Sequence, residues 1–412
     1  MNILFLNAYY EPEIFSSSYL VNNLTEALVK EGFHVSVFAP VPSRGVSNDV
    51  RRQYKKIRVE KLYDGRLKVH RFSMFKEGGN VIGRAFRYFY LNLKLFFKGL
   101  FTKTDLIFLY STPPIQGMMG AVLKFFKRVP FVYNLQDIFP DSMISAGITS
   151  KKSFIYKIGR RIENVSYKSA DKIIVISESF KENIIKKGVP EEKIEIVYNW
   201  VDENEVTHIE RKDNPIFDML QIPRDGFYVC YAGNIGLLQN LSTLIDAAEI
   251  LQNKEPQIKF VIIGNGAWKP EMLNQIDEKQ LNNVMTFPMQ DTKYVPYVYN
   301  LGDIGIVTIA KDVSKSALPS KTWNILSASR PVICEVDEGS ELEHIITENK
   351  CGLCVVPGDS EGLADKILTL YNDREMIMSM GGNGRKFIED NITRKKSTQK
   401  ILDCIVKVKK EN

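Results

Sequence analysis

The chain has 412 residues, of which 44% are hydrophobic and 25% are charged, and its formal net charge is +6. This composition excludes intrinsic disorder, and the length predicts two domains of about 200 residues each, with a cleft between them. The positive charge is small for this length, and the sequence has no zinc-finger spacing or aromatic RNA-binding motif, so we expect no nucleic-acid partner.

The N-terminal half alternates short apolar runs with amphipathic stretches, a pattern that predicts parallel strands covered by helices. The expected strands cover residues 3–6, 35–38, 106–109, 131–135, 173–176 and 194–197. The first run leads into a loop without a basic leader or a cleavage site, and no apolar run is long enough to span a bilayer. We therefore expect a cytoplasmic protein.

Polar side chains follow two of these strands. Glu13, Ser16 and Ser17 lie in the loop after the first strand, and Gln136 and Asp137 follow strand 131–135. Ligands of such sheets bind beyond the carboxyl ends of the strands. Asp137 could accept hydrogen bonds from sugar hydroxyls, or it could cap the next turn. The first loop lacks the Gly-x-Gly-x-x-Gly pattern of a standard dinucleotide fold.

Residues 82–101 combine seven aromatic residues with Arg84, Arg87, Lys94 and Lys98. On a helix these four cations fall near one face, which is compatible with peripheral docking on an anionic membrane, at the inner face of the cytoplasmic membrane. A core helix with a solvated basic face has the same pattern. The sequence leaves both interpretations open.

A polar segment at 199–218 interrupts the alternation and predicts the domain boundary. We place one domain at 1–203, a second at 204–385, and a C-terminal helix at 386–412 that could cross back to the first domain. Strands of the second domain are expected at 227–231, 260–263, 284–287, 304–307, 332–334 and 353–356. Apolar residues at helical spacing predict a helix over 241–251 that packs on this sheet.

Two glycine turns follow strands of the second domain. Gly233 and Gly236 stand between a strand and a helix, and Gly264 and Gly266 follow the next strand. Glycine lets the backbone approach a phosphate, and a helix start offers free N–H groups. A tight turn that needs glycine for its geometry would look the same.

The stretch "SALPSKTWNILSASRPV", residues 316–332, opens an otherwise apolar helix with polar groups. Ser320 is placed to cap the helix, and Lys321 and Asn324 lie on one helical face. A cation, an amide and free N–H groups suit the phosphates and ribose of a nucleoside diphosphate. An N-cap followed by a surface lysine is the alternative.

Other residue types argue against several chemistries. The four histidines, His34, His70, His208 and His344, lie outside these loops, which disfavours histidine acid–base catalysis and a histidine metal site. The odd count of five cysteines indicates reduced thiols. Cys351 and Cys354 form a lone Cys-x-x-Cys in a short apolar strand, which we interpret as structural.

Together the motifs resemble those of the family 4 retaining glycosyltransferases, over nearly the whole chain. The resemblance is carried by "YYEPE", "LQDIFPDS", "YNWVD", "YAGNIGLLQNLSTLIDAA", "VIIGNG", "LPSKTWNILSASRPVI" and "VVPGD". It implies an α/β protein of the GT-B fold, in which two Rossmann-like, doubly wound domains face each other across a cleft. In that fold the first domain binds the acceptor and the second binds the nucleotide-sugar.

The resemblance also implies an activity. A hexosyl or N-acetylhexosaminyl group would pass from a UDP-sugar to a glycan or lipid-linked acceptor with retention of configuration, in capsule, O-antigen or exopolysaccharide synthesis. No metal or other cofactor is expected. Two alternatives remain open at this stage: a non-catalytic scaffold that binds a nucleotide-sugar, and a GT-B-type sugar-nucleotide epimerase.

The family's pattern assigns roles to the residues identified above. Asp137 and Lys321 would act in catalysis, and Glu13, Ser16, Ser17 and Gln136 would contact the acceptor or the sugar. The nucleotide-sugar would be bound by Gly233, Asn234, Gly236, Gln239, Gly264, Gly266, Ser320, Lys321 and Asn324. Asn234 and Gln239 stand where the family usually has Arg and Lys, and Ser316 and Asn324 stand where it usually has two glutamates. Lys321 is therefore the leading candidate to neutralise the diphosphate.

Overall fold

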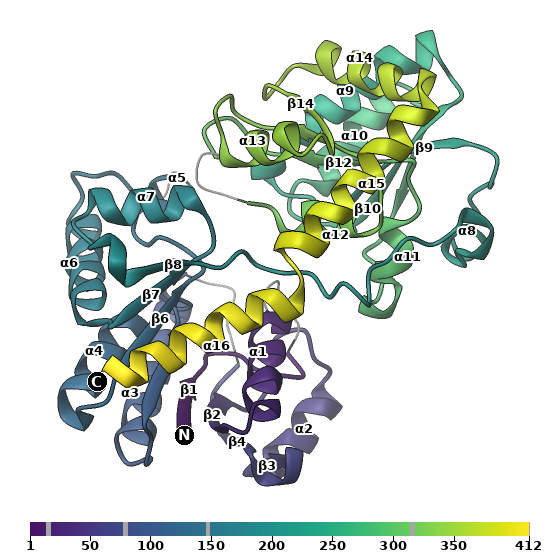
Figure 1. Cartoon of the computed structure of the whole chain (residues 1–412). Coiled ribbons are helices and arrows are strands. Elements are labelled where there is room, and N and C mark those ends of the chain that lie inside the picture. Colours follow the sequence, from purple (N-terminus) through teal and green to yellow (C-terminus); the bar gives the residue numbers. More distant parts are fainter. Residues whose placement is uncertain (14–17, 77–80, 146–148, 314–317, 412) are drawn as a thin grey trace. The chain divides into compact units, whose positions relative to one another are not determined.

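The structure is a computed structural model that describes residues 1–13, 18–76, 81–145, 149–313 and 318–411. The chain forms two compact units, Met1–Tyr198 with Lys395–Asn412, and Asn199–Arg394. Each unit is a twisted sheet covered by helices (Figure 1). This confirms the α/β fold class with two Rossmann-like domains.

The first unit contains an eight-stranded sheet in the order β3-β4-β2-β1-β5-β6-β7-β8. All neighbours pair in parallel except β3 and β4, which are antiparallel. The strands are β1 (Asn2–Leu6), β2 (His34–Pro40), β3 (Val59–Leu62), β4 (Leu67–Phe72), β5 (Leu106–Tyr110), β6 (Phe131–Leu135), β7 (Lys172–Val175) and β8 (Ile194–Ile196). The six expected strands are confirmed, and β3 and β4 are additions at the edge of the sheet.

Eight helices belong to the described part of this unit. They are α1 (Ser18–Lys30), α2 (Asn48–Lys56), α3 (Val81–Leu100), α4 (Gln116–Lys127), α5 (Asp141–Ser145), α6 (Phe154–Ser169), α7 (Glu178–Lys186) and α16 (Arg394–Glu411). Short 3-10 turns lie at Tyr63–Gly65 and Glu191–Lys193.

The second unit has a six-stranded parallel sheet in the order β11-β10-β9-β12-β13-β14. The strands are β9 (Phe227–Asn234), β10 (Ile258–Asn265), β11 (Val284–Phe287), β12 (Ile304–Thr308), β13 (Val332–Glu335) and β14 (Gly352–Val355). The helices are α8 (Ile216–Met219), α9 (Leu241–Lys254), α10 (Lys269–Glu278), α11 (Val295–Tyr299), α12 (Ser320–Ser327), α13 (Glu341–Glu348), α14 (Ser360–Asn372) and α15 (Arg374–Asn391). Further 3-10 turns lie at Arg211–Asp213, Leu237–Gln239 and Thr292–Tyr294.

Helix α9 shows how the apolar periodicity of the sequence predicted residues of the second unit's hydrophobic core. Its residues at helical spacing, Leu241, Leu244, Ile245, Ala248 and Leu251, are all buried against the sheet. They share one face because residues three and four apart lie above one another on a helix. The predicted helix over 241–251 is therefore confirmed.

The chain passes between the units after Tyr198 and again after Arg394, whereas the sequence placed these boundaries at 203 and 385. The second passage comes later because α15 continues to Asn391. Next to it, the Val201 N–H donates to the Ile392 carbonyl, and the Arg394 N–H donates to the Val201 carbonyl. The two connecting segments are thus hydrogen-bonded to each other.

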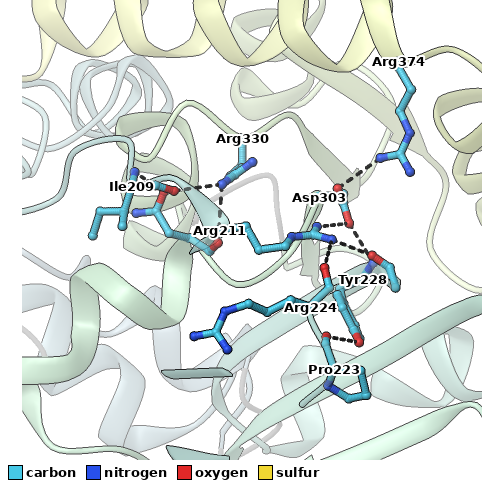
Figure 2. A network of polar contacts seen from close by, with 10 residues as sticks. Ile209, Arg211, Pro223, Arg224, Tyr228, Asp303, Arg330 and Arg374 are labelled. Carbon is cyan, nitrogen blue, oxygen red and sulfur yellow. Dashed lines mark hydrogen bonds and ion pairs between the residues drawn. The ribbon is translucent and has the colours of Figure 1, made fainter. Parts of the chain in front are cut away.

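A polar network fastens the start of the second unit to the amino ends of its strands (Figure 2). The Asp303 carboxylate, directly before β12, accepts hydrogen bonds from Arg211, Arg374 and the Tyr228 N–H. Arg330 donates to the carbonyl of Ile209. Since these groups lie at the amino ends of β9 and β12, the carboxyl ends of the strands are left for ligands.

Candidate functional site

The two glycine turns of the second unit lie side by side at the carboxyl edge of the sheet. Strands β9 and β10 pair in register up to their last residues, so that Gly233 is opposite Gly264 and Asn234 is opposite Asn265. Two loops that are about 30 residues apart in sequence are adjacent because parallel strands end at the same edge.

The glycines of the second turn make this close approach possible. A Cβ atom on Gly264 would lie 2.1 Å from the Gly233 carbonyl oxygen, and a Cβ on Gly266 would lie 2.1 Å from the Ile235 carbonyl oxygen. Gly233 itself has a φ of 145°, which side chains disfavour. Packing of one turn on the other therefore accounts for Gly264 and Gly266 without any ligand.

Lys321, in the first turn of α12, points to the first glycine turn. Its Nζ lies 3.1 Å from the position that a Cβ on Gly233 would take. It also lies 3.9 Å from the centre of the Tyr231 ring, on β9. Nζ is buried and has no hydrogen-bond partner among the described residues. Burial lowers the pKa of Lys321 from 10.5 to about 7.

The remaining polar residues of this helix start have different settings. Helix α12 begins at Ser320 itself, after Pro319, and no side chain caps it, so the predicted capping by Ser320 is wrong. Ser320 is exposed, which leaves its hydroxyl available. Asn324, one turn along the helix, shares a hydrogen bond with the hydroxyl of the half-buried Tyr299. Ser316 lies outside the described residues.

Asn234 and Gln239 bond to each other across the turn. The Asn234 amide donates to Oε1 of Gln239 at 3.0 Å, and the Gly236 N–H donates to the same oxygen at 3.1 Å. This bond pattern closes the turn without a charged side chain. The two residues that replace the family's usual cations thus stabilise the loop that Lys321 faces.

Two further residues at this edge, Lys269 and Glu335, were not predicted from the sequence. Lys269 follows the second turn, and its Nζ donates to the Gly264 carbonyl at 3.2 Å, which places another cation beside the paired turns. The sequence feature that could have identified Lys269 is its position three residues after Gly266, at the start of a helix.

Glu335, the last residue of β13, is fully buried. Its Oε1 accepts hydrogen bonds from the side chains of Asn240 and Thr243 and from the Gly358 N–H. Burial raises the pKa of Glu335 from 4.5 to about 7. The carboxyl connects the start of α9 to the loop after β14. These segments are far apart in the sequence, so a local sequence pattern could not predict the contact.

The predicted residues of the first unit are held mostly by their own loops. The N–H groups of Gln136 and Asp137 both donate to the Ser111 hydroxyl, at 2.9 and 3.2 Å. The Asp137 carboxylate accepts a hydrogen bond from Ser142 at 2.9 Å. It also lines a small pocket with Ser111 and Tyr133, and burial raises its pKa.

Glu13 is buried, and its carboxylate is occupied by another loop. Oε1 accepts from the N–H groups of Ser43 and Arg44, at 2.7 and 3.0 Å, while Oε2 accepts from the Tyr10 N–H. This arrangement gives Glu13 a role in fixing the loop after β2. Ser16 and Ser17 lie outside the described residues.

The expected basic face of α3 is turned toward the protein. Arg87 is buried and donates to the Phe75 carbonyl and the Ser43 hydroxyl. Lys94 donates to the Ser73 carbonyl, and Lys98 lies over the rings of Phe38 and Phe72. A solvated basic face is therefore wrong for Arg87, whereas Lys94 and Lys98 are half-buried. The side chain of Arg84 is outside the described part of the structure.

The cysteines and possible metal ligands agree with ordinary packing. All five cysteines are unpaired, and burial raises the pKa of Cys351 and Cys354 to about 12. Within the described ranges, no group of three His, Cys, Asp or Glu side chains could hold a metal ion. Metal independence of the reaction stays a prediction. No helix in the described residues is both long and apolar enough to cross a membrane.

Comparison with known proteins connects both units to sugar transfer. Residues 18–205 match the family model described as Glycosyltransferase Family 4, and residues 213–387 match the model described as Glycosyl transferases group 1. The probable glycosyltransferase WbjE of Pseudomonas aeruginosa is 24% identical over 327 residues, which cover 79% of each chain. The putative colanic acid biosynthesis glycosyl transferase WcaI of Escherichia coli K12 is 28% identical over 236 residues, 56% of this chain and 58% of WcaI.

Solved structures show the same architecture. The crystal structure of Anabaena Alr3699/HepE in complex with UDP-glucose superposes with a TM-score of 0.73 over 99% of this chain and 100% of that one. The sequences are 17% identical, so the likeness shows the fold alone. That fold is GT-B.

Proposed function

We propose that this chain, a glycosyltransferase of the GT-B type by both of its domains, transfers a sugar from a nucleotide-sugar to a glycan or lipid-linked acceptor with retention of configuration. The second unit binds the donor at the paired glycine turns. The relatives named for colanic acid and capsular polysaccharide biosynthesis support a role in cell-surface polysaccharide synthesis in the cytoplasm.

The donor site is supported by one observation: the buried ammonium of Lys321 faces the turn at Gly233, and no carboxylate of the described residues pairs with it. A charge buried without a partner is costly, so a fold keeps one where a ligand supplies the counter-charge. At about 4 Å and an effective dielectric constant of 20, a phosphate charge and an ammonium attract by about 4 kcal/mol before desolvation. A diphosphate would supply the negative charge that the buried ammonium lacks.

The chemistry follows from charge stabilisation. The bond between the anomeric carbon and the diphosphate breaks, and the acceptor oxygen forms its bond to that carbon on the same face. The departing phosphate oxygen takes the acceptor's proton, so no separate protein base and no metal is required. Lys321, together with the N–H groups of the turn and of α12, stabilises the charge that develops on the leaving group.

Other residues position the two substrates. Asn324 can donate and accept hydrogen bonds, as a ribose requires, and Ser320 and Lys269 offer further polar contacts to the phosphates. Asp137 and Gln136 are proposed to contact the sugar or the acceptor. HepE was crystallised with UDP-glucose and with UDP, which makes UDP-sugars the first donors to test.

The test is a donor screen with the purified chain. Binding of UDP and of a panel of UDP-sugars is measured by calorimetry, and transfer is followed with lipid-linked and glycan acceptors. We expect one UDP-sugar to bind and to be turned over with the anomeric configuration kept in the product. Tight UDP binding without any product across the panel would favour a binding scaffold, and an inverted product would overturn retention.

A further inference from the structure

The outer face of α3 is apolar between Phe86 and Phe97. The exposed side chains among those described on this helix are Phe86, Phe89, Tyr90, Leu93 and Phe97, and Phe101 follows directly after its end. Phe101 is 83% exposed. Single exposed hydrophobic residues are common, but a helix of a soluble protein normally turns its polar face outward. Helix α3 has the opposite arrangement.

This surface continues onto neighbouring segments of the same unit. Phe75 stacks on Phe86 and on Tyr90, with ring centres 6.2 and 5.9 Å apart. At the other end, Phe126 of α4 contacts Phe96, and Phe125 contacts Phe126. Phe125 and Phe126 are 77% and 61% exposed. We call the set Phe75, Phe86, Phe89, Tyr90, Leu93, Phe97, Phe101, Phe125 and Phe126 the aromatic ridge.

The segment of the chain that contains most of this ridge is rich in basic residues. Residues 81–136 hold eight Lys and Arg but a single acidic residue, Asp105, so the segment carries +7 where the whole chain carries +6. Lys103 and Arg128 are exposed beside the ridge, and Lys127 donates to the carbonyls of Leu100 and Thr102 at the end of α3. A surface hollow lined by Phe125, Phe126 and Arg128 lies at the same place.

We propose that the aromatic ridge docks on the surface of an anionic lipid bilayer. Aromatic rings settle at the level of the lipid headgroups, and neighbouring lysines and arginines attract anionic lipids. A large contiguous apolar patch marks an interaction surface. A second copy of this chain is a poor occupant because the exposed cations Lys103 and Arg128 of the two copies would repel each other.

The surface proposed to contact the membrane is therefore the aromatic face of α3, and not the basic face that the sequence suggested. Arg87, Lys94 and Lys98 hold α3 on the protein, and this leaves the rings free to enter the lipid. The docking is independent of the donor site, since every residue of the ridge belongs to the first unit.

The experiment uses the full-length chain and vesicles. Co-sedimentation is measured with vesicles of phosphatidylcholine alone and with vesicles that also contain phosphatidylglycerol. The double variant Phe101→Ser/Phe125→Ser tests the rings, and Lys103→Gln/Arg128→Gln tests the charges. The matched controls are Phe154→Ser/Met378→Ser, two side chains outside the ridge set that are 76% and 69% exposed, and Lys395→Gln/Lys400→Gln, two exposed lysines of α16.

We expect binding to the anionic vesicles and a loss of about tenfold or more in partitioning for the ring variant, because one buried aromatic ring alone is worth about that factor. The charge variant should lose binding to anionic vesicles and lose most of its salt dependence, while both controls bind normally. Unchanged binding of the ring variant would overturn the proposal. So would a concentration-dependent dimer, detected by light scattering, that the ring variant dissociates while vesicle binding stays as before.

UDP binding by the same variants separates this proposal from the proposed function. It should equal that of the unmodified chain, because the ridge lies outside the second unit. If the chain binds UDP but does not bind vesicles, only the membrane proposal is contradicted. If it binds vesicles but no nucleotide, only the proposed donor site is contradicted.

Discussion

The ammonium of Lys321 lies 3.9 Å above the centre of the Tyr231 ring. The ring face attracts a cation, but it carries no net negative charge and so offsets little of the cost of burying one. We therefore expect an anion, the proposed diphosphate, to supply the counter-charge when the donor binds. This relationship gives the first two predictions.

Replacing Lys321 by Met should separate binding from stability. Met fills a similar volume without charge, so transfer should fall by about a hundredfold or more in kcat/KM, while the protein becomes more stable. The pKa of Lys321 is lowered, so its cost is fully present below about pH 7 and fades as the pH rises toward 10.5. The melting temperature should therefore rise by several degrees at pH 6.5 and by less at pH 9.5.

The control for this experiment is Lys254→Met, on an exposed lysine of α9 far along the helix from the turn. It should leave transfer and stability nearly unchanged. If the activity of Lys321→Met is close to that of the unmodified enzyme, Lys321 does not contribute to the donor site.

Donor binding should weaken as the pH rises above about 7. In the free protein Lys321 loses its proton near that pH, and binding of a diphosphate must return it. The affinity for a UDP-sugar, whose phosphates do not titrate in this range, should fall by up to tenfold per pH unit above 7. Calorimetry in buffers of different ionisation enthalpy should detect proton uptake at pH 8. A pH-independent affinity from pH 7 to 9 would contradict a charged Lys321 in the complex.

Gly264→Ala should damage the paired turns. The added Cβ would lie 2.1 Å from the Gly233 carbonyl oxygen, and because this atom belongs to the backbone the turn must shift. We expect a loss of about 1–3 kcal/mol of stability and weaker UDP binding. Gly382→Ala, in α15, is the matched control, because no atom lies within 4 Å of its Cβ position. It should be neutral or stabilising, and equal effects of the two variants would refute the packing argument.

Glu335→Gln should stabilise the chain in a pH-dependent way. Gln keeps the oxygen that accepts hydrogen bonds from Asn240, Thr243 and Gly358, but it removes a carboxyl whose pKa burial raises to about 7. The cost of the ionised carboxylate is fully present above pH 7 and absent below about 4.5. The gain in melting temperature should be several degrees at pH 8 and near zero at pH 4.5. A gain that is equal at both pH values would point to a cause other than ionisation.

Removal of divalent cations should leave transfer unchanged. In the proposed mechanism the leaving diphosphate is stabilised by Lys321 and backbone N–H groups, and no step requires a metal. Initial rates are compared with and without EDTA for the best donor. Loss of activity that Mg²⁺ or Mn²⁺ restores would show that the reaction depends on a metal.

Much of the fold could be predicted because its strands are buried on both faces. Residues 106–110 and 131–135 are buried throughout, and in the sequence they are apolar except for Asn134. Strand β3, at the sheet edge, and its neighbour β4 were not predicted because Lys61, Lys68 and His70 interrupt the apolar pattern.

The site was predictable where its residues are neighbours in one local motif. Gly233, Gly264 and Lys321 follow strands or open a helix, and parallel sheets bring such positions together. Glu13 was different, because its carboxylate is taken by Ser43, which is 30 residues away. Helix α3 shows the same limit. Its periodicity identified the cationic face, but both faces contain apolar residues, so the sequence did not determine which one packs on the sheet.

The last helix, α16, belongs to the first unit although 196 residues of the second unit precede it. Its apolar residues Ile401, Leu402, Ile405 and Val408 are buried, so part of the first unit's hydrophobic surface is covered by the end of the chain. During synthesis on the ribosome, this surface stays uncovered until the whole second unit has been made. A fragment that ends at Tyr198 would consequently expose it, and attempts to express the first unit alone should append residues 395–411 through a linker.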